Sequence, residues 1–448
     1  MEIEETIRKY ALENAVKFDG KANPGAIIGK VLAENPGLKE KAKDLHPRIQ
    51  QIVKEVNGLG LDEQKKQLEA FGPIERKKKE HKIFGFLSIE QKGIVTSFPP
   101  GPEKFPHIGH AKACYINYLL AKEHEGRFIL RFEDTNPNTV KAEYYQAMID
   151  DFGWLGIGWD ELHYASDDMD LYYKHAEDLI GEARAYVCTC EGDAIKRSRS
   201  DGVACDCREK SVAENLRAWH SFSEKEEGSA ILRLKVDLNH PNSTMRDPTL
   251  FRIIEGEHAR HRDKYRVWPT YDMQTSVMDG YLGITHRLRS KEFEMRNELQ
   301  RYIQDILGYK KTEIYEFARF NMEGVPSSGR KIREMIASKE LIGWDDPKLN
   351  TLVALRRRGF VPEAIKEFVI STGITKSEST LTWDDLIVHN KRVLDSKVNR
   401  YFFIDDPVKV KITGVPEMTA HLEKHPEFRE RGTRELRINE DLYLAKED

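Results

Sequence analysis

The stretch GIVTSFPPGPEKFPHIGHAKACYINYLLAKEHE, residues 93–125, decides the fold. Apolar residues at its start predict a short β-strand, and three prolines keep the following loop out of any sheet. A long run with apolar residues at helical spacing comes next, and Gly126 is placed to end it. Residues 128–132 are mostly apolar and predict a second strand. The sequence therefore predicts a strand–helix–strand unit, with His107 and His110 at the start of its helix.

The two histidines are placed to bind a ligand. A helix N-terminus presents unpaired N–H groups and a partial positive charge, which favour phosphate. Side chains three residues apart lie on one helix face, so both imidazoles can reach the same ligand. Gly109 between them would let a flat base or a triphosphate approach the backbone. The alternative is a proline-rich turn before a core helix, with two incidental histidines.

Two motifs together resemble a known family. His107-Ile108-Gly109-His110, preceded by TSFPP at 96–100, resembles the ATP-binding signature of class I aminoacyl-tRNA synthetases. RFEDTNP at 131–137 narrows the resemblance to the glutamyl/glutaminyl subgroup, and other regions resemble its archaeal-type glutamyl-tRNA synthetases. The resemblance implies a Rossmann-like catalytic domain that activates L-glutamate with ATP and Mg²⁺ and charges tRNA(Glu). It leaves open whether tRNA(Gln) is a second substrate.

Composition agrees with a cytoplasmic enzyme of this kind. The chain has 448 residues, of which 39% are hydrophobic and 33% charged, and its net charge is −4. Nucleic-acid contacts would therefore use local basic patches, not a positive field over the whole surface. No run approaches a membrane span, and the acidic N-terminus is unlike a signal peptide. Five cysteines in a chain of this size do not make a disulfide framework.

Pattern and resemblance together predict an α/β multidomain protein, expected as a monomer. The expected segments are a helical N-terminal module (1–88), the first half of the catalytic α/β domain (89–180), an inserted domain that binds the tRNA acceptor end (181–262), the second half of the catalytic domain (263–320), a signature loop with a helical domain that contacts the tRNA stem (321–394), and the start of a β-barrel anticodon-binding region (395–448). About fifty residues are too few for two barrels, so this last region is expected to be abbreviated or truncated.

The two ends of the chain carry weaker patterns. In the N-terminal module, helices are predicted over 2–18, 36–58 and 62–71, with a turn at Asn23-Pro24-Gly25. The basic linker after it, with Lys77, Lys78 and Lys79, is either solvated or in contact with tRNA phosphates. The module itself is expected to bind another protein or tRNA. Later in the chain a helix is predicted at 343–347 and strands at 400–403, 408–413 and 434–444.

Four cysteines predict a metal site. Cys188 and Cys190 form one Cys-x-Cys pair, Cys205 and Cys207 form a second, and fourteen residues separate the two pairs. Four thiolates brought together suit tetrahedral Zn²⁺, whereas the alternative is a set of small thiols with no metal. By resemblance, a structural zinc would lie in the inserted domain.

A second ATP-binding element is predicted in VPSSGRKI at 325–332. A Ser/Gly-rich loop with two cations is suited to close on phosphates, although it could also be a plain turn. The resemblance aligns Lys331 with the catalytic lysine of the second class I signature, and Arg330 would assist it. With His107, Gly109 and His110, these residues make the expected ATP site.

The amino-acid pocket is assigned by resemblance. Glu133 aligns with a carboxylate that pairs with the substrate ammonium, and Tyr271 aligns with a tyrosine that lines the pocket. Arg289 falls where glutamate enzymes carry an arginine, whose fork can bind a carboxylate with two hydrogen bonds. Neutral glutamine would leave that cation unpaired, which favours glutamate as the substrate. The alternative is an ordinary surface arginine.

Three positions depart from the family pattern. Ser97 stands where the family usually has an arginine that helps hold the amino acid, and Glu103 and Lys104 replace a usual small pair. These departures keep other interpretations open: a glutaminyl-tRNA synthetase, a tRNA-modifying paralogue, or a catalytically weakened tRNA-binding or scaffolding protein. Other histidine-signature nucleotidylyltransferases would not explain the motif at 131–137.

Overall fold

The computed structural model describes residues 3–34, 42–71, 84, 87, 89–326, 328–414, 416–438 and 441–446. The chain divides into two compact units, Met1–Lys82 and Ile83–Asp448. Lys77, Lys78 and Lys79 of the basic linker lie outside the described residues, as does Ser327 of the predicted signature loop. Within the described ranges, no helix is long and apolar enough to cross a bilayer.

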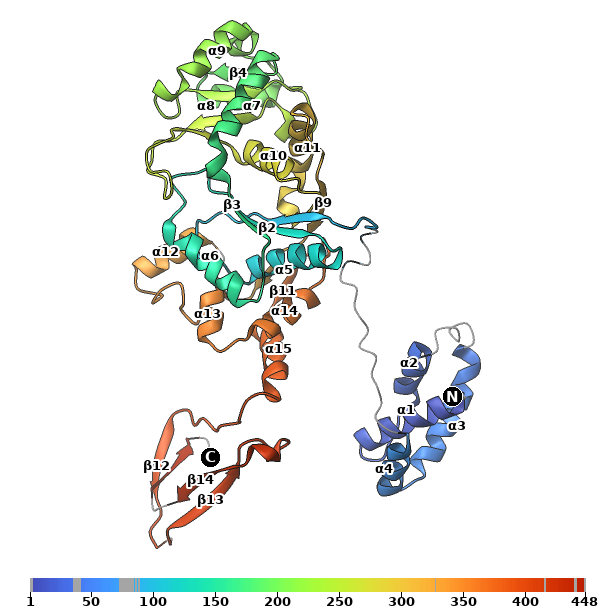
Figure 1. Ribbon diagram of the computed structural model, residues 1–448. Coiled ribbons are helices and arrows are strands. Elements are labelled where there is room, and N and C mark those ends of the chain that lie inside the picture. Colours follow the sequence, from blue (N-terminus) through green and yellow to red (C-terminus); the bar gives the residue numbers. More distant parts are fainter. Residues whose placement is uncertain are drawn as a thin grey trace. The chain divides into compact units, whose positions relative to one another are not determined.

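The N-terminal unit is built from helices (Figure 1): α1 (Ile3–Lys17), α2 (Pro24–Glu34), α3 (Ala42–Asn57) and α4 (Leu61–Ala70). Helix α1 contacts the other three, and apolar side chains such as Ile7, Ile27 and Val53 form their shared buried core. Gln64 is buried beside it and donates to three backbone carbonyls, including that of Val56 at 2.8 Å.

Helix α2 corrects the sequence prediction of a turn at its start. The side-chain oxygen of Asn23 accepts the N–H of Gly25 at 2.9 Å, and Pro24 is the first helical residue. Asparagine before a helix and proline in its first turn are both favourable, because the asparagine binds a free N–H and proline has none to leave unpaired. The same three residues therefore begin a helix.

A five-stranded parallel sheet forms the centre of the larger unit. Its order is β3 (Glu161–Tyr164), β2 (Arg127–Phe132), β1 (Val95–Phe98), β8 (His286–Ser290), β9 (Glu313–Phe317). Helix α5 (Ile108–Glu123) connects β1 to β2, and α6 (Ala142–Trp154) connects β2 to β3. Helix α11 (Asn297–Ile306) lies between β8 and β9 in the chain. The predicted strand–helix–strand unit and the Rossmann-like α/β fold are confirmed.

Between β3 and β8 the chain builds a second, antiparallel sheet. It has the order β4 (Ala185–Cys188), β5 (Ile231–Leu234), β6 (Thr249–Ile253), β7 (Val267–Pro269). Helices α7 (Met169–Gly181), α8 (Gly192–Asp201) and α9 (Val212–His220) belong to this part, and α10 (Tyr271–Tyr281) returns the chain to β8. Fully buried Trp268 and Phe251 belong to one apolar cluster that also includes residues of α10 and α11.

The helical part that follows contains α12 (Gly329–Ala337), α13 (Leu352–Arg357), α14 (Pro362–Ser371) and α15 (Trp383–Asp395). Strand β10 (Phe320–Met322) pairs in parallel with β11 (Ser379–Leu381). The helix predicted over 343–347 is wrong: the Asp346 carboxylate accepts the N–H groups of Ile342 and Lys348 at 3.0 and 2.9 Å, which holds a turn there.

Two small antiparallel sheets follow at the C-terminal end. They are β12 (Pro407–Lys411) with β15 (Asp441–Ala445), and β13 (Met418–Glu423) with β14 (Thr433–Ile438). The strand predicted at 400–403 is absent; instead Tyr401, Phe402 and Phe403 are exposed and belong to no strand. The Arg434 guanidinium lies over the Tyr401 ring at 4.9 Å, so the β-favouring aromatics there pack against a cation and do not pair with a strand.

Candidate active site

The order of the parallel sheet fixes where a ligand can bind. The chain moves outward in one direction from β1 through β2 to β3, and in the other direction from β8 to β9. In such sheets ligands bind beyond the carboxyl ends of the strands, at the point where the order reverses. The order reverses between β1 and β8, and both strands carry buried side-chain atoms without hydrogen-bond partners in the described chain. They are Ser97 Oγ on β1 and, on β8, Arg287 Nε and Nη1, Arg289 Nε and Ser290 Oγ. Of these, Arg287 Nη1 is ion-paired with Asp279 at 2.6 Å.

His107 and His110 face one another at the start of α5. Their ring centroids are 4.0 Å apart. Nδ1 of His107 accepts the Gly109 N–H at 3.1 Å, and Nδ1 of His110 accepts the His107 N–H at 3.1 Å. Since Nδ1 is the acceptor in both rings, each neutral imidazole carries its proton on Nε2. The histidines therefore cap the helix with one nitrogen and keep a donor N–H for a ligand.

These contacts correct the expectation of free backbone N–H groups at this helix end. The N–H groups of His107 and Gly109 are bound by imidazoles, and that of His110 donates to the His107 carbonyl at 2.8 Å. The Ile108 N–H donates to the Asn350 carbonyl at 3.0 Å. An anion bound here would be contacted by side chains, because the first N–H groups are already paired.

Gly109 has a structural role in this arrangement. A Cβ at this position would lie 2.9 Å from Cε1 and 3.0 Å from Nδ1 of His107. Such distances are shorter than van der Waals contact, so any larger residue would displace the imidazole ring. The sequence suggested that Gly109 admits a ligand; the structure adds that it admits the His107 side chain.

Both imidazoles are held neutral. The pKa of His107 is lowered well below its usual value, and that of His110 to about 3. Burial is the main cause for both imidazoles, and the charges of Lys104 and Arg319 add to it. A histidine whose folded pKa is depressed stabilises the fold above its unfolded pKa, near 6.5, and this stabilisation is lost as the pH falls toward the folded pKa.

We therefore expect the His110→Asn variant to lose less stability on acidification than the unmodified chain. Asparagine keeps an oxygen that can accept the His107 N–H but takes up no proton. The measurement is the urea midpoint of the full chain between pH 7.5 and 4.5. The exposed His220, replaced by asparagine in the same way, is the control. An equal loss of midpoint in the His110 variant and the parent would contradict the prediction.

The predicted ammonium-binding carboxylate lies in a buried network. Glu133 Oε1 accepts Arg131 Nη2 at 3.0 Å and Thr275 Oγ1 at 2.6 Å, and Arg131 Nη1 is held by Asp279 at 2.7 Å. Burial raises the pKa of Glu133, and the Arg131 charge and the Thr275 hydrogen bond partly offset this increase. Its second oxygen makes no hydrogen bond within the described chain and is available to a ligand.

Arg289 is a buried cation surrounded by neutral acceptors. Nη1 donates to Gln300 Oε1 at 2.9 Å and lies 3.4 Å from the Tyr271 hydroxyl, and Nη2 donates to the Phe293 carbonyl at 3.0 Å and to the Asn297 side chain. Burial, with Arg287 nearby, lowers its pKa to about 10. No carboxylate of the described residues forms an ion pair with it. The surface-arginine alternative is wrong, since only 7% of Arg289 is exposed.

The structure brings some predicted residues together and leaves others apart. Glu133 and Arg289 both lie close to Tyr271. Burial is the largest cause that raises the pKa of the Tyr271 phenol; the Glu133 charge raises it further, and the Arg289 charge lowers it. Lys331 is exposed on α12 and makes no hydrogen bond or ion pair with described residues. The Arg330 guanidinium pairs with Glu334 at 2.9 Å on its own helix. The predicted mobile loop is helical from Gly329 onward.

Sequence reasoning missed the residues that hold the pocket in place. Gln300 and Asn297 bind Arg289, and Thr275 binds Glu133. Asp279 binds Arg131, the partner of Glu133, and none of the four stood out as a motif. One signal was present for two of them: α10 carries Asp272, Gln274, Thr275, Ser276 and Asp279, all buried. Several buried polar residues on one helix indicate a polar site beside it, because buried polar groups need hydrogen-bond partners.

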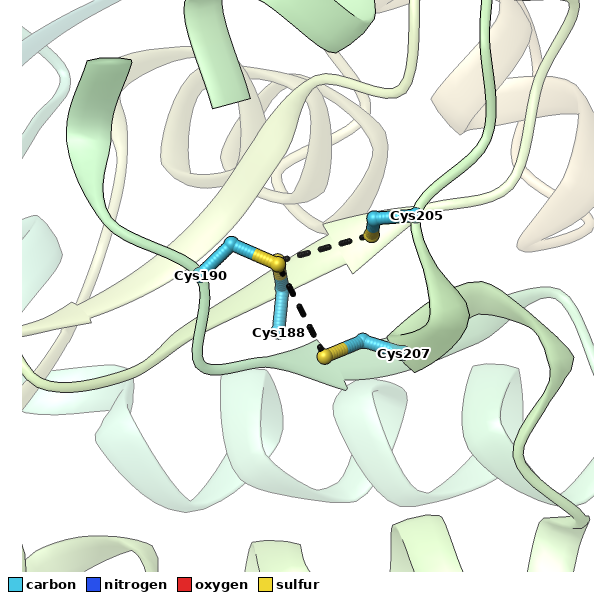
Figure 2. A group of neighbouring side chains, drawn as sticks. All are labelled: Cys188, Cys190, Cys205 and Cys207. Carbon is cyan, nitrogen blue, oxygen red and sulfur yellow. Dashed lines mark hydrogen bonds between the residues drawn. The ribbon is translucent and has the colours of Figure 1, made fainter. Parts of the chain in front are cut away.

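The four cysteines converge as the sequence predicts. Figure 2 shows their sulfur atoms pointing toward one another, two from the end of β4 and two around the short 3₁₀ helix η3 (Asp206–Glu209). Cys188 and Cys205 Sγ are 3.9 Å apart, as are Cys190 and Cys207, and all four lie within 4.8 Å of one another. A tetrahedral Zn²⁺ with bonds of about 2.3 Å needs sulfur atoms about 3.8 Å apart, so this set fits the ion.

Fold and site together define a class I tRNA synthetase. The catalytic-domain model "tRNA synthetases class I (E and Q)" matches residues 93–396, and the anti-codon binding domain model of the same group matches 398–448. The chain belongs to this family, and within it to the group of archaeal glutamate–tRNA ligases. It is 44% identical to the glutamate–tRNA ligase of Pyrococcus abyssi and 39% identical to that of Methanothermobacter marburgensis, over all of this chain and 81% and 82% of those proteins.

Solved structures agree with the fold. A glutamate tRNA ligase from Elizabethkingia meningosepticum, in complex with its amino acid, superposes with a TM-score of 0.51 at 17% identity. The match covers 69% of this chain and 71% of that one. A glutamate-tRNA synthetase from Elizabethkingia anophelis gives 0.50 at 18% identity. At such identities the likeness concerns the fold alone.

Proposed function

We propose that this protein activates L-glutamate with ATP and transfers the glutamyl group to the 3′ end of tRNA(Glu). The observation that carries the proposal is Arg289, a buried guanidinium that pairs with no carboxylate of the described chain. A buried charge without a counter-ion is costly, so the site favours a ligand that supplies one. The side-chain carboxylate of glutamate is such a ligand, and Glu133 would pair with its ammonium group.

In the first step an α-carboxylate oxygen of glutamate attacks the α-phosphorus of ATP. The bond from this phosphorus to the bridging oxygen breaks, and pyrophosphate leaves with the electron pair. In the second step a ribose hydroxyl of the terminal tRNA nucleotide attacks the acyl carbon and loses its proton. The bond from this carbon to the phosphate oxygen breaks, and AMP leaves with the electron pair. Protein side chains mainly position two anions and stabilise negative charge on the phosphates. His107 and His110 would donate from Nε2, and Mg²⁺ bound with ATP would supply further positive charge.

Further assignments belong to the same proposal. Lys331, assisted by Arg330, would contact the ATP phosphates from the start of α12. Cys188, Cys190, Cys205 and Cys207 would hold a structural Zn²⁺ in the part that binds the tRNA acceptor end. The protein would act as a monomer in the cytoplasm, where its tRNA substrate is, and the N-terminal unit would bind tRNA or another protein.

Amino-acid-dependent exchange of pyrophosphate into ATP tests the proposal. We expect exchange with glutamate and little with glutamine, measured with and without tRNA, because an activating site can require bound tRNA to be complete. Charging assays with tRNA(Glu) and tRNA(Gln) then determine whether one or both are substrates. If neither amino acid supports exchange even with tRNA, the Ser97 departure is decisive and the protein is a tRNA-binding relative.

A further inference from the structure

Lys104 occupies a distinctive place between the two predicted ATP-binding elements. It lies three residues before His107, in the loop after β1, and its side chain runs against the first residue of α12. A Cβ added at Gly329 would be 3.0 Å from Lys104 Cδ and 3.5 Å from its Cβ. The absence of a side chain at Gly329 therefore gives the lysine stem room to pass. The contact joins the histidine loop to α12.

The surroundings of Lys104 are short of negative charge. Its ammonium makes no hydrogen bond or ion pair with any described residue. Burial and the charges of Arg319 and Arg333 lower the pKa of Lys104, whereas the Glu103 charge raises it. The Glu103 carboxylate instead accepts the Thr139 hydroxyl at 3.0 Å, while Arg333 donates to the Glu103 carbonyl at 3.1 Å. A partly buried lysine among arginines is in the arrangement expected of a cation that binds an anionic ligand.

The N-terminus of α5 has no positively charged group of its own to bind phosphate. Its first N–H groups are paired within the protein, and His107 and His110 are neutral, so they can donate hydrogen bonds but bring no positive charge. Lys331, the lysine that the resemblance assigns to the phosphates, is exposed on the surface of α12. The Lys104 charge is already close enough to shift the pKa of both imidazoles, after burial.

We propose that Lys104 is a phosphate-binding cation of this enzyme, which contacts the triphosphate of ATP beside His107 and is seated by Gly329 at the start of α12. The inference rests on the proposed function and adds to it a residue at a position where the family usually has a small one. The site would distinguish ATP from adenosine by charge, since the lysine contacts only phosphate.

The test compares binding of MgATP and of adenosine to the full chain by calorimetry. We expect Lys104→Met to weaken MgATP binding about 10- to 100-fold, as for loss of a charged hydrogen bond, and to leave adenosine binding unchanged. Lys104→Arg should restore most of the ATP affinity. Lys92→Met removes an exposed lysine paired with Glu125 and should change neither. Equal ATP affinity in Lys104→Met and the parent would overturn the inference.

Gly329 gives an independent test. Gly329→Val should displace the Lys104 stem and weaken ATP binding several-fold in the parent, but should have little further effect when Lys104 is already methionine. Additive losses in the double variant would mean that Gly329 does not act through Lys104, and would overturn the seating part of the inference. The proposed function fails separately: if the parent binds MgATP in a Lys104-dependent manner but supports no glutamate exchange, the function is wrong while the phosphate contact stands.

Discussion

Replacing Arg289 with glutamine is expected to lower kcat/KM for glutamate in pyrophosphate exchange by roughly 10²- to 10³-fold. Glutamine at this position can donate one hydrogen bond but supplies neither the charge nor the fork that a carboxylate needs. The loss should appear mainly as a higher KM for glutamate, with the KM for ATP little changed. The ratio of glutamine to glutamate activation should rise, because the penalty on a neutral substrate falls.

Stability separates this role from a structural one. Burial lowers the pKa of Arg289, so the fold disfavours its charged form and the residue costs the apo protein stability. Arg289→Gln should therefore keep or raise the thermal midpoint while activity falls. Arg301→Gln, on α11 and in an exposed pair with Glu313, is the control and should retain activity. A large drop in midpoint together with activity would indicate that Arg289 holds the pocket's shape.

The sequence predicted the parts of the site that lie in contiguous motifs. The strand, the proline-rich loop and the two histidines are close in sequence, so helical spacing sufficed to place both imidazoles on one helix end. Cys190 and Cys205 converge because a short helix and a turn connect them, which makes their spacing informative. Local patterns of this kind need no knowledge of the rest of the fold.

Other features depended on distant parts of the chain. The Ile108 N–H is paired by the Asn350 carbonyl, more than two hundred residues away, so no local pattern could show that the N-terminus of α5 lacks free N–H groups. The partners of Arg289, Gln300 and Asn297, are only 11 and 8 residues away, but they lie on α11, and strand and helix patterns do not show which side chains of two separate elements meet. The position of Lys104 beside Gly329 is a tertiary contact between the loop after β1 and the start of α12, and each residue alone looks like a departure from a motif.

Removal of the proposed Zn²⁺ is expected to unfold the lobe formed by residues 189–210 and to spare the antiparallel sheet β4–β7. Helix α8 contains no buried residue, and its ends are joined to the rest of the protein by Cys190 before it and Cys205 after it. The sheet β4–β7, in contrast, has a large apolar core of its own. Zinc binding contributes about 10–16 kcal/mol in small zinc-dependent peptides, far more than the exposed helix can contribute by packing. The segment from residue 189 to 210 should therefore depend on zinc for its structure.

Cys190→Ser should reduce bound zinc from one ion per chain to none at moderate metal concentration. Trypsin should then cleave rapidly after Lys196 and Arg197, which are exposed but helical in the intact lobe. Cys114→Ala removes the buried cysteine outside the cluster and should keep the metal and the resistance to trypsin. Charging of tRNA should fall more than glutamate-dependent exchange, because residues 189–210 include none of the proposed ATP- or glutamate-binding residues and belong to the part proposed to bind the tRNA acceptor end. A parent protein that binds no zinc, or a Cys190 variant that resists trypsin equally well, would show that the four thiols hold this lobe without a metal.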